Sequence, residues 1–404
     1  MRYLTTERLL TNLIGTNMPP STYKPLFNRR YLFWLAWAVA IAIVLLSATG
    51  REKPRQALPI SWQAEPTHWR MQIDTQDHYQ LDALLSTSAA FGLTGRQLQA
   101  THYHAIRQRL SLPESEAQLK QFGWQPSLTH ETALIRLRLQ MAAEPTQTQL
   151  NWLLQQLHAA HSPLNAAEQQ RILAEWRLDI QQPEARLMAE LEHWQVPIIS
   201  DNNHWQLLLT GPDLEAGVGE PTQVIPAEKD RGLPSATTYL LDGYTSTPHQ
   251  LLAWPSPAIT DTSSLALNRA AVLALQLALQ QQNERRNYRL IWQPLPPQSH
   301  LALILSEPLV KTTSAVLPQL ITDEISDSLL LQAQAQLLEQ FSERYSHPDF
   351  QHQWLELTAL LGLPLGSELS YATALQQLSA DAIRQQLQFL LNADHQLSVT
   401  LKPF

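Results

Sequence analysis

The chain has 404 residues, a formal net charge of −8 and only 16% charged residues. Binding to a nucleic-acid backbone needs clustered Lys and Arg, so this acidic balance argues against a nucleic-acid partner. The chain has no cysteine, which excludes disulfides, thiolate metal sites and cysteine nucleophiles. Its 12 glycines are few for this length, and a low glycine content favours long helices.

An uncharged apolar run occupies residues 31–50, with the sequence YLFWLAWAVAIAIVLLSATG. A helix of this length rises about 30 Å, the thickness of a bilayer's hydrocarbon core. The basic residues before the run are Arg2, Arg8, Lys24, Arg29 and Arg30, and those just after it are Arg51, Lys53 and Arg55. This imbalance favours a cytoplasmic N-terminus.

The run therefore predicts a cytoplasmic tail at 1–30 and a single-pass transmembrane helix at 31–50. In a bacterium, the protein would lie in the inner membrane with the bulk of the chain in the periplasm. A signal peptide cleaved after Ala48-Thr49-Gly50 is the alternative interpretation of the same run.

Two blocks follow the predicted membrane segment. A polar, proline-containing stretch at 51–68 indicates a tether. We expect one domain at 69–209 and a second at 238–404. The intervening stretch at 210–237 contains four of the 12 glycines, which together with four prolines predicts a linker.

Both blocks mix strands and helices. In the first, apolar residues alternate with polar ones over 133–141, which predicts a half-buried strand. A helix should cover 150–157, and Asn165 with Glu168 forms a capping-box pattern that starts another. In the second block, we expect a strand near 301–305 and a long helix over 328–344.

The end of the second block repeats the order of the first. Ser379 is predicted to cap a helix, and Leu397, Val399 and Leu401 alternate with polar residues in a final strand. The fold class is therefore α+β, with the same mixed pattern used twice.

Several short motifs and their order resemble the insulinase/pitrilysin family of zinc metallopeptidases. The motifs are LQATHYHAIR at 98–107, LPESEAQLKQFG at 112–123, ILAEWRLDIQQP at 172–183, LSADAIR at 378–384 and SVTLKP at 398–403. The resemblance covers about residues 69–404 and implies two related insulinase-like α+β domains. It also implies that the chain supplies one half of a chamber that family members build from two such halves.

The resemblance implies a degenerate zinc site. In the family, an H-x-x-E-H helix supplies two zinc ligands and the general base, and a later helix supplies a glutamate ligand. The corresponding positions here are His102, Ala105, Ile106 and Glu175. The base and the second histidine are both replaced, so we expect no catalytic residue, no bound metal and no cofactor.

A second implication concerns substrate contact. The family's non-catalytic subunits carry an arginine and a tyrosine that help to hold substrate, and Arg286 and Tyr288 are the residues of those types in the comparable region. Their spacing is shorter than the family pattern. A charged helix end that continues into an edge strand is the alternative interpretation.

Three functions are consistent with these features. The first is a membrane-anchored, catalytically inactive partner of a second insulinase-like chain with an intact zinc motif, in peptide or protein processing. The second is a stand-alone periplasmic binding or scaffold protein with the same fold. The third is an active zinc peptidase whose site differs from the family motif, in which case the purified protein should contain the metal.

Overall fold

The computed structural model describes residues 56–87, 90–131, 133–158, 164–194, 205–217, 219, 235–243, 246–282, 287–295, 299–306 and 325–403. Residues Ala57–Phe404 form one compact unit. The predicted cytoplasmic tail and the predicted transmembrane helix at 31–50 lie outside the described residues.

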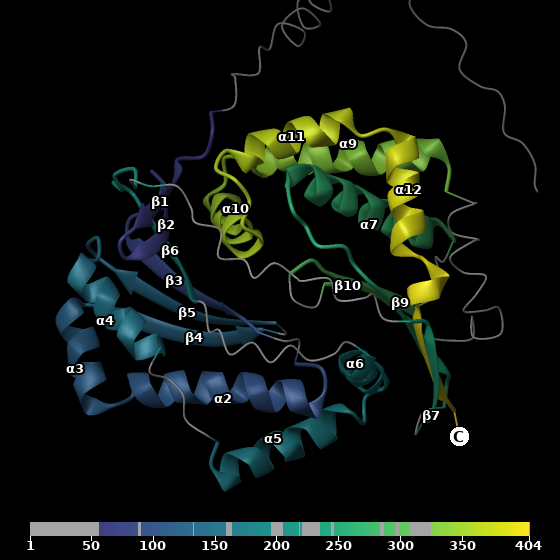
Figure 1. Ribbon diagram of the computed structural model, residues 1–404, viewed down its shortest axis with the longest axis horizontal. Helices are drawn as coiled ribbons and strands as arrows, with labels where there is room; N and C mark the ends of the chain where they lie inside the picture. The colour runs from purple at the N-terminus through teal and green to yellow at the C-terminus, as the bar shows by residue number, and fades with distance from the viewer. Residues whose placement is uncertain are drawn as a thin grey trace, which may run out of the picture. The chain divides into compact units, whose positions relative to one another are not determined.

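The first half of this unit is built on a six-stranded sheet with the strand order β1-β2-β6-β3-β5-β4 (Figure 1). Its strands are β1 (Ile60–Ala64), β2 (Thr67–Gln72), β3 (Tyr79–Ser86), β4 (Gln125–Glu131), β5 (Leu134–Met141) and β6 (Trp205–Gly211). The alternating pattern at 133–141 correctly predicted β5. Leu58 and Trp62 are buried in the core, so residues 58–68 of the predicted tether belong to the folded unit.

The described residues of this half form five helices: α2 (Leu93–Leu110), α3 (Pro113–Phe122), α4 (Gln147–His158), α5 (Ala166–Asp179) and α6 (Pro183–Trp194). The apolar side chains on one face of the sheet pack against α2 and α4, because strand residues alternate between two faces. The capping box of Asn165 and Glu168 forms as predicted and fixes the start of α5.

The second half contains a five-stranded sheet with the order β7-β11-β8-β10-β9. The strands are β7 (Thr237–Asp242), β8 (His249–Pro255), β9 (Asn287–Gln293), β10 (His300–Ser306) and β11 (Leu397–Lys402). Its helices are α7 (Thr262–Gln282), α9 (Asp327–Arg344), α10 (Pro348–Leu361), α11 (Ser367–Gln377) and α12 (Ala380–Leu390), and η2 (Ala393–His395) is a 3-10 turn. The predicted strand near 301–305, the helix near 328–344, the Ser379 cap and the last strand are all present.

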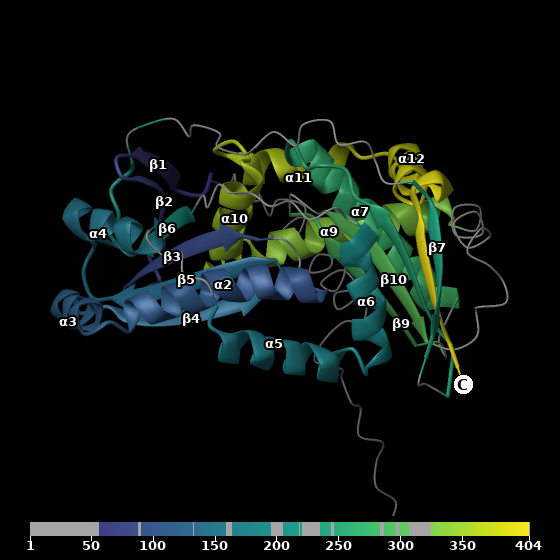
Figure 2. The ribbon, with the colours of Figure 1, turned by 60° about the horizontal axis from the view of Figure 1, so that its bottom comes forward.

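Each half contributes a helix to the other half's sheet. Helix α6 packs Leu187 and Leu191 against the face of the second sheet that includes Leu251 and Val399, and Figure 2 shows α6 beside that sheet. Helix α10 lies against β6 and β2 of the first sheet. The two predicted blocks therefore form a single packed unit.

Helix α7 is, within the described part of the chain, the one helix long and apolar enough to span a membrane. Its apolar window is 56% buried inside the unit, and Ala270, Ala274 and Leu275 belong to the core. It is therefore a core helix of the second half.

Candidate functional site

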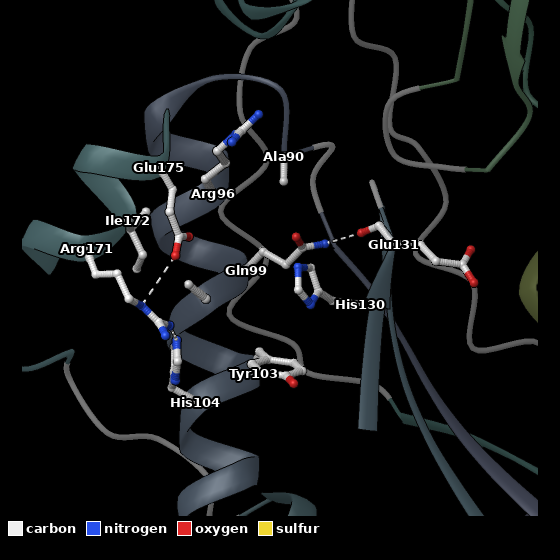
Figure 3. Close-up of a pocket in the computed structure, with 11 residues that line it drawn as sticks. Ala90, Arg96, Gln99, Tyr103, His104, His130, Glu131, Arg171, Ile172 and Glu175 are labelled. Carbon is white, nitrogen blue, oxygen red and sulfur yellow. Dashed lines mark hydrogen bonds and ion pairs between the residues drawn. The ribbon is translucent and has the colours of Figure 1, made fainter. Parts of the chain in front are cut away.

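A pocket of about 450 Å³ lies between α2 and α5, at the end of the edge strand β4. We call it the first pocket (Figure 3). Its lining residues are Ala90, Arg96, Gln99, Ala100, Tyr103, His104, His130, Glu131, Arg171, Ile172 and Glu175. It is therefore the place where the described structure brings Glu175 close to α2.

The face of α2 that lines this pocket differs from the face that the resemblance implied. Ala105 and Ile106 are 5% and 2% exposed and belong to the core beneath the first sheet. His102 does not line the pocket. The pocket-lining residues Ala100, Tyr103 and His104 have the same i, i+3, i+4 spacing, two residues earlier in the helix.

The physical reason for this difference is the apolar stripe of α2. Ile106 and Leu110 lie one turn apart and are both buried, so they turn that side of the helix toward the sheet. The side that carries Ala100 and His104 is then left to face α5. This apolar pair is the sequence signal that could have placed the pocket face correctly.

Arg171 of α5 bridges the two polar groups that a metal site would use. Its Nη2 lies 2.9 Å from Nε2 of His104, and its Nε lies 3.6 Å from Oε1 of Glu175. Figure 3 shows the guanidinium between these two side chains. A fixed positive charge therefore lies where a cation shared by His104 and Glu175 would lie.

The electrostatics of His104 agree with this arrangement. Burial lowers the pKa of His104, and although Glu168 acts in the opposite direction, the charges of Arg171 and Arg107 lower it further. The ring is therefore neutral near pH 7. A neutral imidazole has one nitrogen free to accept a hydrogen bond, and the Arg171 guanidinium is positioned to donate it.

These residues do not fit a catalytic zinc ion. Such an ion is held by three protein ligands and keeps an open position for water. On the pocket face, Ala100 and Tyr103 replace the first histidine and the glutamate of an H-x-x-E-H pattern, and Arg171 competes for His104 and Glu175. In the register that the sequence motifs implied, the base position Ala105 and the ligand position Ile106 are buried in the core, so that register does not supply a site either.

The predicted substrate-contact residues are Arg286 and Tyr288. Arg286 lies outside the described residues. Tyr288 lies on β9, is half-buried and packs against the core between the second sheet and α7. It does not line the first pocket.

A buried charged cluster, which the sequence did not reveal, joins β3, β5 and α10. His352 Nε2 lies 2.8 Å from Asp82 Oδ2 and 3.1 Å from Glu356 Oε1. Arg136 forms ion pairs with both carboxylates, and Arg138 Nε lies 3.0 Å from Asp82 Oδ1. Asp82 and His352 are 270 residues apart, so no local motif could indicate their contact.

Asp82, His352 and Glu356 could geometrically surround a metal ion, but both carboxylates already have positively charged partners. Burial alone would raise the pKa of Asp82, yet hydrogen bonds from His352 and Arg138 outweigh it and hold the pKa at about 2. Burial alone would lower the pKa of His352, yet hydrogen bonds to Asp82 and Glu356 raise it to about 9. The protonated His352, Arg136 and Arg138 are therefore the counter-ions of the two carboxylates.

No protein-family model matches the sequence, and no curated protein matches it. Solved structures do match. A protein from Alicyclobacillus acidocaldarius described as M16-like peptidase is 11% identical, with a TM-score of 0.60 and coverage of 87% of this chain and 99% of that one. The inactive domain of a peptidase M16 from Pseudomonas fluorescens is 13% identical, with a TM-score of 0.59 and coverage of 85% and 98%.

A third match indicates how the chain relates to larger proteins. The periplasmic protease PqqL from Escherichia coli is 12% identical, with a TM-score of 0.54, and the match covers 83% of this chain but 44% of that one. The chain thus has the insulinase/pitrilysin-like fold of M16 peptidases, as the sequence motifs indicated. Because all these identities are low, the likeness concerns the fold.

Proposed function

We propose that this chain is a membrane-anchored, non-catalytic peptidase-like subunit that acts beside a second chain of the same fold with an intact zinc motif. The observation that carries this proposal is Arg171. Its guanidinium contacts His104 and lies near Glu175, so the pocket already holds a permanent cation, and the arrangement is suited to shaping a surface rather than to activating water.

A role in binding peptides is supported by the edge strand beside the pocket. Strand β4 pairs with β5 on one side only, and most of its side chains are exposed. His130 and Glu131, at its end, line the first pocket. An unpaired strand edge offers backbone donors and acceptors to an extended peptide, so a peptide added to β4 would run past Tyr103 and Arg171.

A partner chain is supported by the match to PqqL, in which the corresponding region covers 44% of the protein. The present chain would supply one half of a chamber, and the partner would supply the other half and the zinc ion. The predicted helix at 31–50 would hold the complex at the inner membrane with residues beyond it in the periplasm.

Affinity purification of a tagged full-length chain in mild detergent tests this partnership. We expect a second chain with an H-x-x-E-H motif to co-purify in about equal amount, and peptidase activity to require that chain. Zinc in near-stoichiometric amount in the isolated chain, with chelator-sensitive cleavage that Glu175→Ala abolishes, would overturn the proposal. Recovery of a monomer alone after cross-linking would favour a stand-alone binding or scaffold protein.

The proposed orientation has its own test. Protease added to bacterial spheroplasts should digest the domain at 57–404 and leave an N-terminal epitope intact. The reverse protection pattern would contradict a cytoplasmic N-terminus. Release of a soluble protein that begins near Arg51 would show that the apolar run is a cleaved signal.

A further inference from the structure

A second pocket, of about 390 Å³, lies in the C-terminal half among α7, β9, α9, α10 and α11. It shares no lining residue with the first pocket. Five aromatic side chains line it, which are Trp292, Phe341, Phe350, Trp354 and Tyr371. It is thus a separate site, of the size at which small-molecule and single-residue pockets begin.

The aromatic side chains form a rigid apolar base. Phe341, Trp354 and Tyr371 are fully buried, and the rings of Trp354 and Tyr371 lie 5.1 Å apart. Trp292 and Phe350 are half-buried at the sides. Because its buried rings are fixed by the core, this base is formed before any ligand binds, and little ordering would be needed on binding.

Two guanidinium groups lie beside this base. Cζ of Arg269 lies 5.5 Å from the ring centre of Tyr371, and Cζ of Arg344 lies 5.9 Å from that of Phe350. Neither guanidinium forms an ion pair with a carboxylate of the described residues. This contrasts with Arg136 and Arg138, which form ion pairs with Asp82 and Glu356.

Cation–π contact leaves the N–H groups of a guanidinium available to an anion. A guanidinium presents a planar fork of donors that matches a carboxylate. The pocket therefore offers an apolar surface and two cations to the same ligand. It is too small for a large polyanion, and the net charge of −8 opposes one.

We propose that this second pocket binds a carboxylate carried on an apolar or aromatic body. The carboxylate would pair with Arg269 and Arg344, and the body would pack on Trp292 and Phe350. A single free acid of this kind and the C-terminal residue of a peptide share this chemistry. The proposal does not depend on the proposed function, because it concerns a different pocket.

Isothermal titration calorimetry on the full-length chain in detergent tests the proposal with four probes. They are N-acetyl-phenylalanine, its amide, and a six-residue peptide that ends in phenylalanine as the free acid or as the amide. We expect each acid to bind at least about tenfold more tightly than its amide, since the amide lacks the negative charge that strengthens hydrogen bonds from the two guanidinium groups. A tighter peptide acid would identify a peptide terminus as the ligand, and equal affinities would identify a single residue.

Variants locate the site. Arg344→Gln removes an exposed cation, so it should fold normally, bind the acids about tenfold more weakly and bind the amides unchanged. Arg269→Gln should act in the same way. Arg177→Gln, on the exposed side of α5, is the matched control and should bind like the unaltered protein. Equal affinity for acid and amide, no detectable binding of either acid, or full affinity in both pocket variants would overturn the proposal.

Discussion

Asp82 and His352 join the two halves of the unit through a 2.8 Å contact between Oδ2 and Nε2. Asp82 lies on β3 and is fully buried, and His352 lies on α10. The even-numbered side of β3 faces α10 and the odd-numbered side faces α2. A buried charge on that side is tolerated because Asp82 forms ion pairs with His352, Arg136 and Arg138.

Removal of one partner from this cluster should destabilise the whole unit. Asp82→Asn removes a negative charge that pairs with His352, Arg136 and Arg138. We expect it to lower the free energy of unfolding by about 3 kcal/mol. Glu184→Gln, which breaks the exposed ion pair with Arg289, is the control and should cost less than about 1 kcal/mol. Urea denaturation measures both, and equal small effects would show that the cluster does not hold the halves together.

The stability of the unit should depend on pH at both ends of the range. The pKa of His352 is raised to about 9 in the folded protein. Its contribution to the free energy of unfolding is therefore fully present below the pKa of an unfolded histidine, about 6.5, and is lost as the pH rises through about 9. The pKa of Asp82 is lowered to about 2 in the folded protein. Its contribution to the free energy of unfolding is therefore fully present above the pKa of an unfolded aspartate, about 3.9, and is lost as the pH falls through about 2.

Denaturation midpoints between pH 6 and pH 10 test the alkaline half of this prediction. The unaltered protein should lose stability above about pH 7, and His352→Gln should show a much smaller loss over the same range. A His352→Gln profile that parallels that of the unaltered protein would assign the pH dependence to other groups.

Glu192 should be essential to the position of α2. It is buried on α6, and its Oε1 accepts a hydrogen bond from the backbone N–H of Gly95 at 2.7 Å, while Oε2 accepts from Gly92. Helix N-termini leave N–H groups without partners. Glu192→Ala should therefore lower the free energy of unfolding by about 2 kcal/mol. Glu190→Ala, two residues earlier on the same helix and less buried, is the control and should lower it less. Equal stability of the two variants would contradict the capping role.

The register of the pocket face can be tested by building a metal site. Ala100→His with Tyr103→Glu and Arg171→Ala places two histidines, at 100 and 104, opposite Glu175, and removes the competing cation. We expect zinc to raise the melting temperature of this variant, because a ligand that binds the folded state stabilises it. The same variant with Glu175→Ala should lose most of that shift.

A zinc site built instead at the positions that the sequence motifs implied should not form. Ala105→Glu with Ile106→His puts polar groups into the core beneath the first sheet, and we expect a loss of at least about 3 kcal/mol without zinc binding. Zinc binding by this variant and not by the previous one would show that Ala105 and Ile106 reach the pocket. Metal content after dialysis and thermal melts decide between the two outcomes.

The sequence by itself determined the local elements. The alternation over 133–141, the Asn165–Glu168 capping box, the Ser379 cap and the final strand depend on residues a few positions apart, so their physics is contained in a short window. The order of the short motifs was sufficient to indicate the fold.

Only the tertiary structure decided which face of α2 meets α5, which sheet α6 covers and where the charges of Asp82 and His352 meet. These outcomes depend on the burial of apolar faces and on contacts between groups up to 270 residues apart. His104 is an example, because its spacing from His102 carries no information about Arg171. Whether a polar side chain lines a pocket depends on which neighbouring apolar side chains, such as Ile106 and Leu110, are buried first against the sheet.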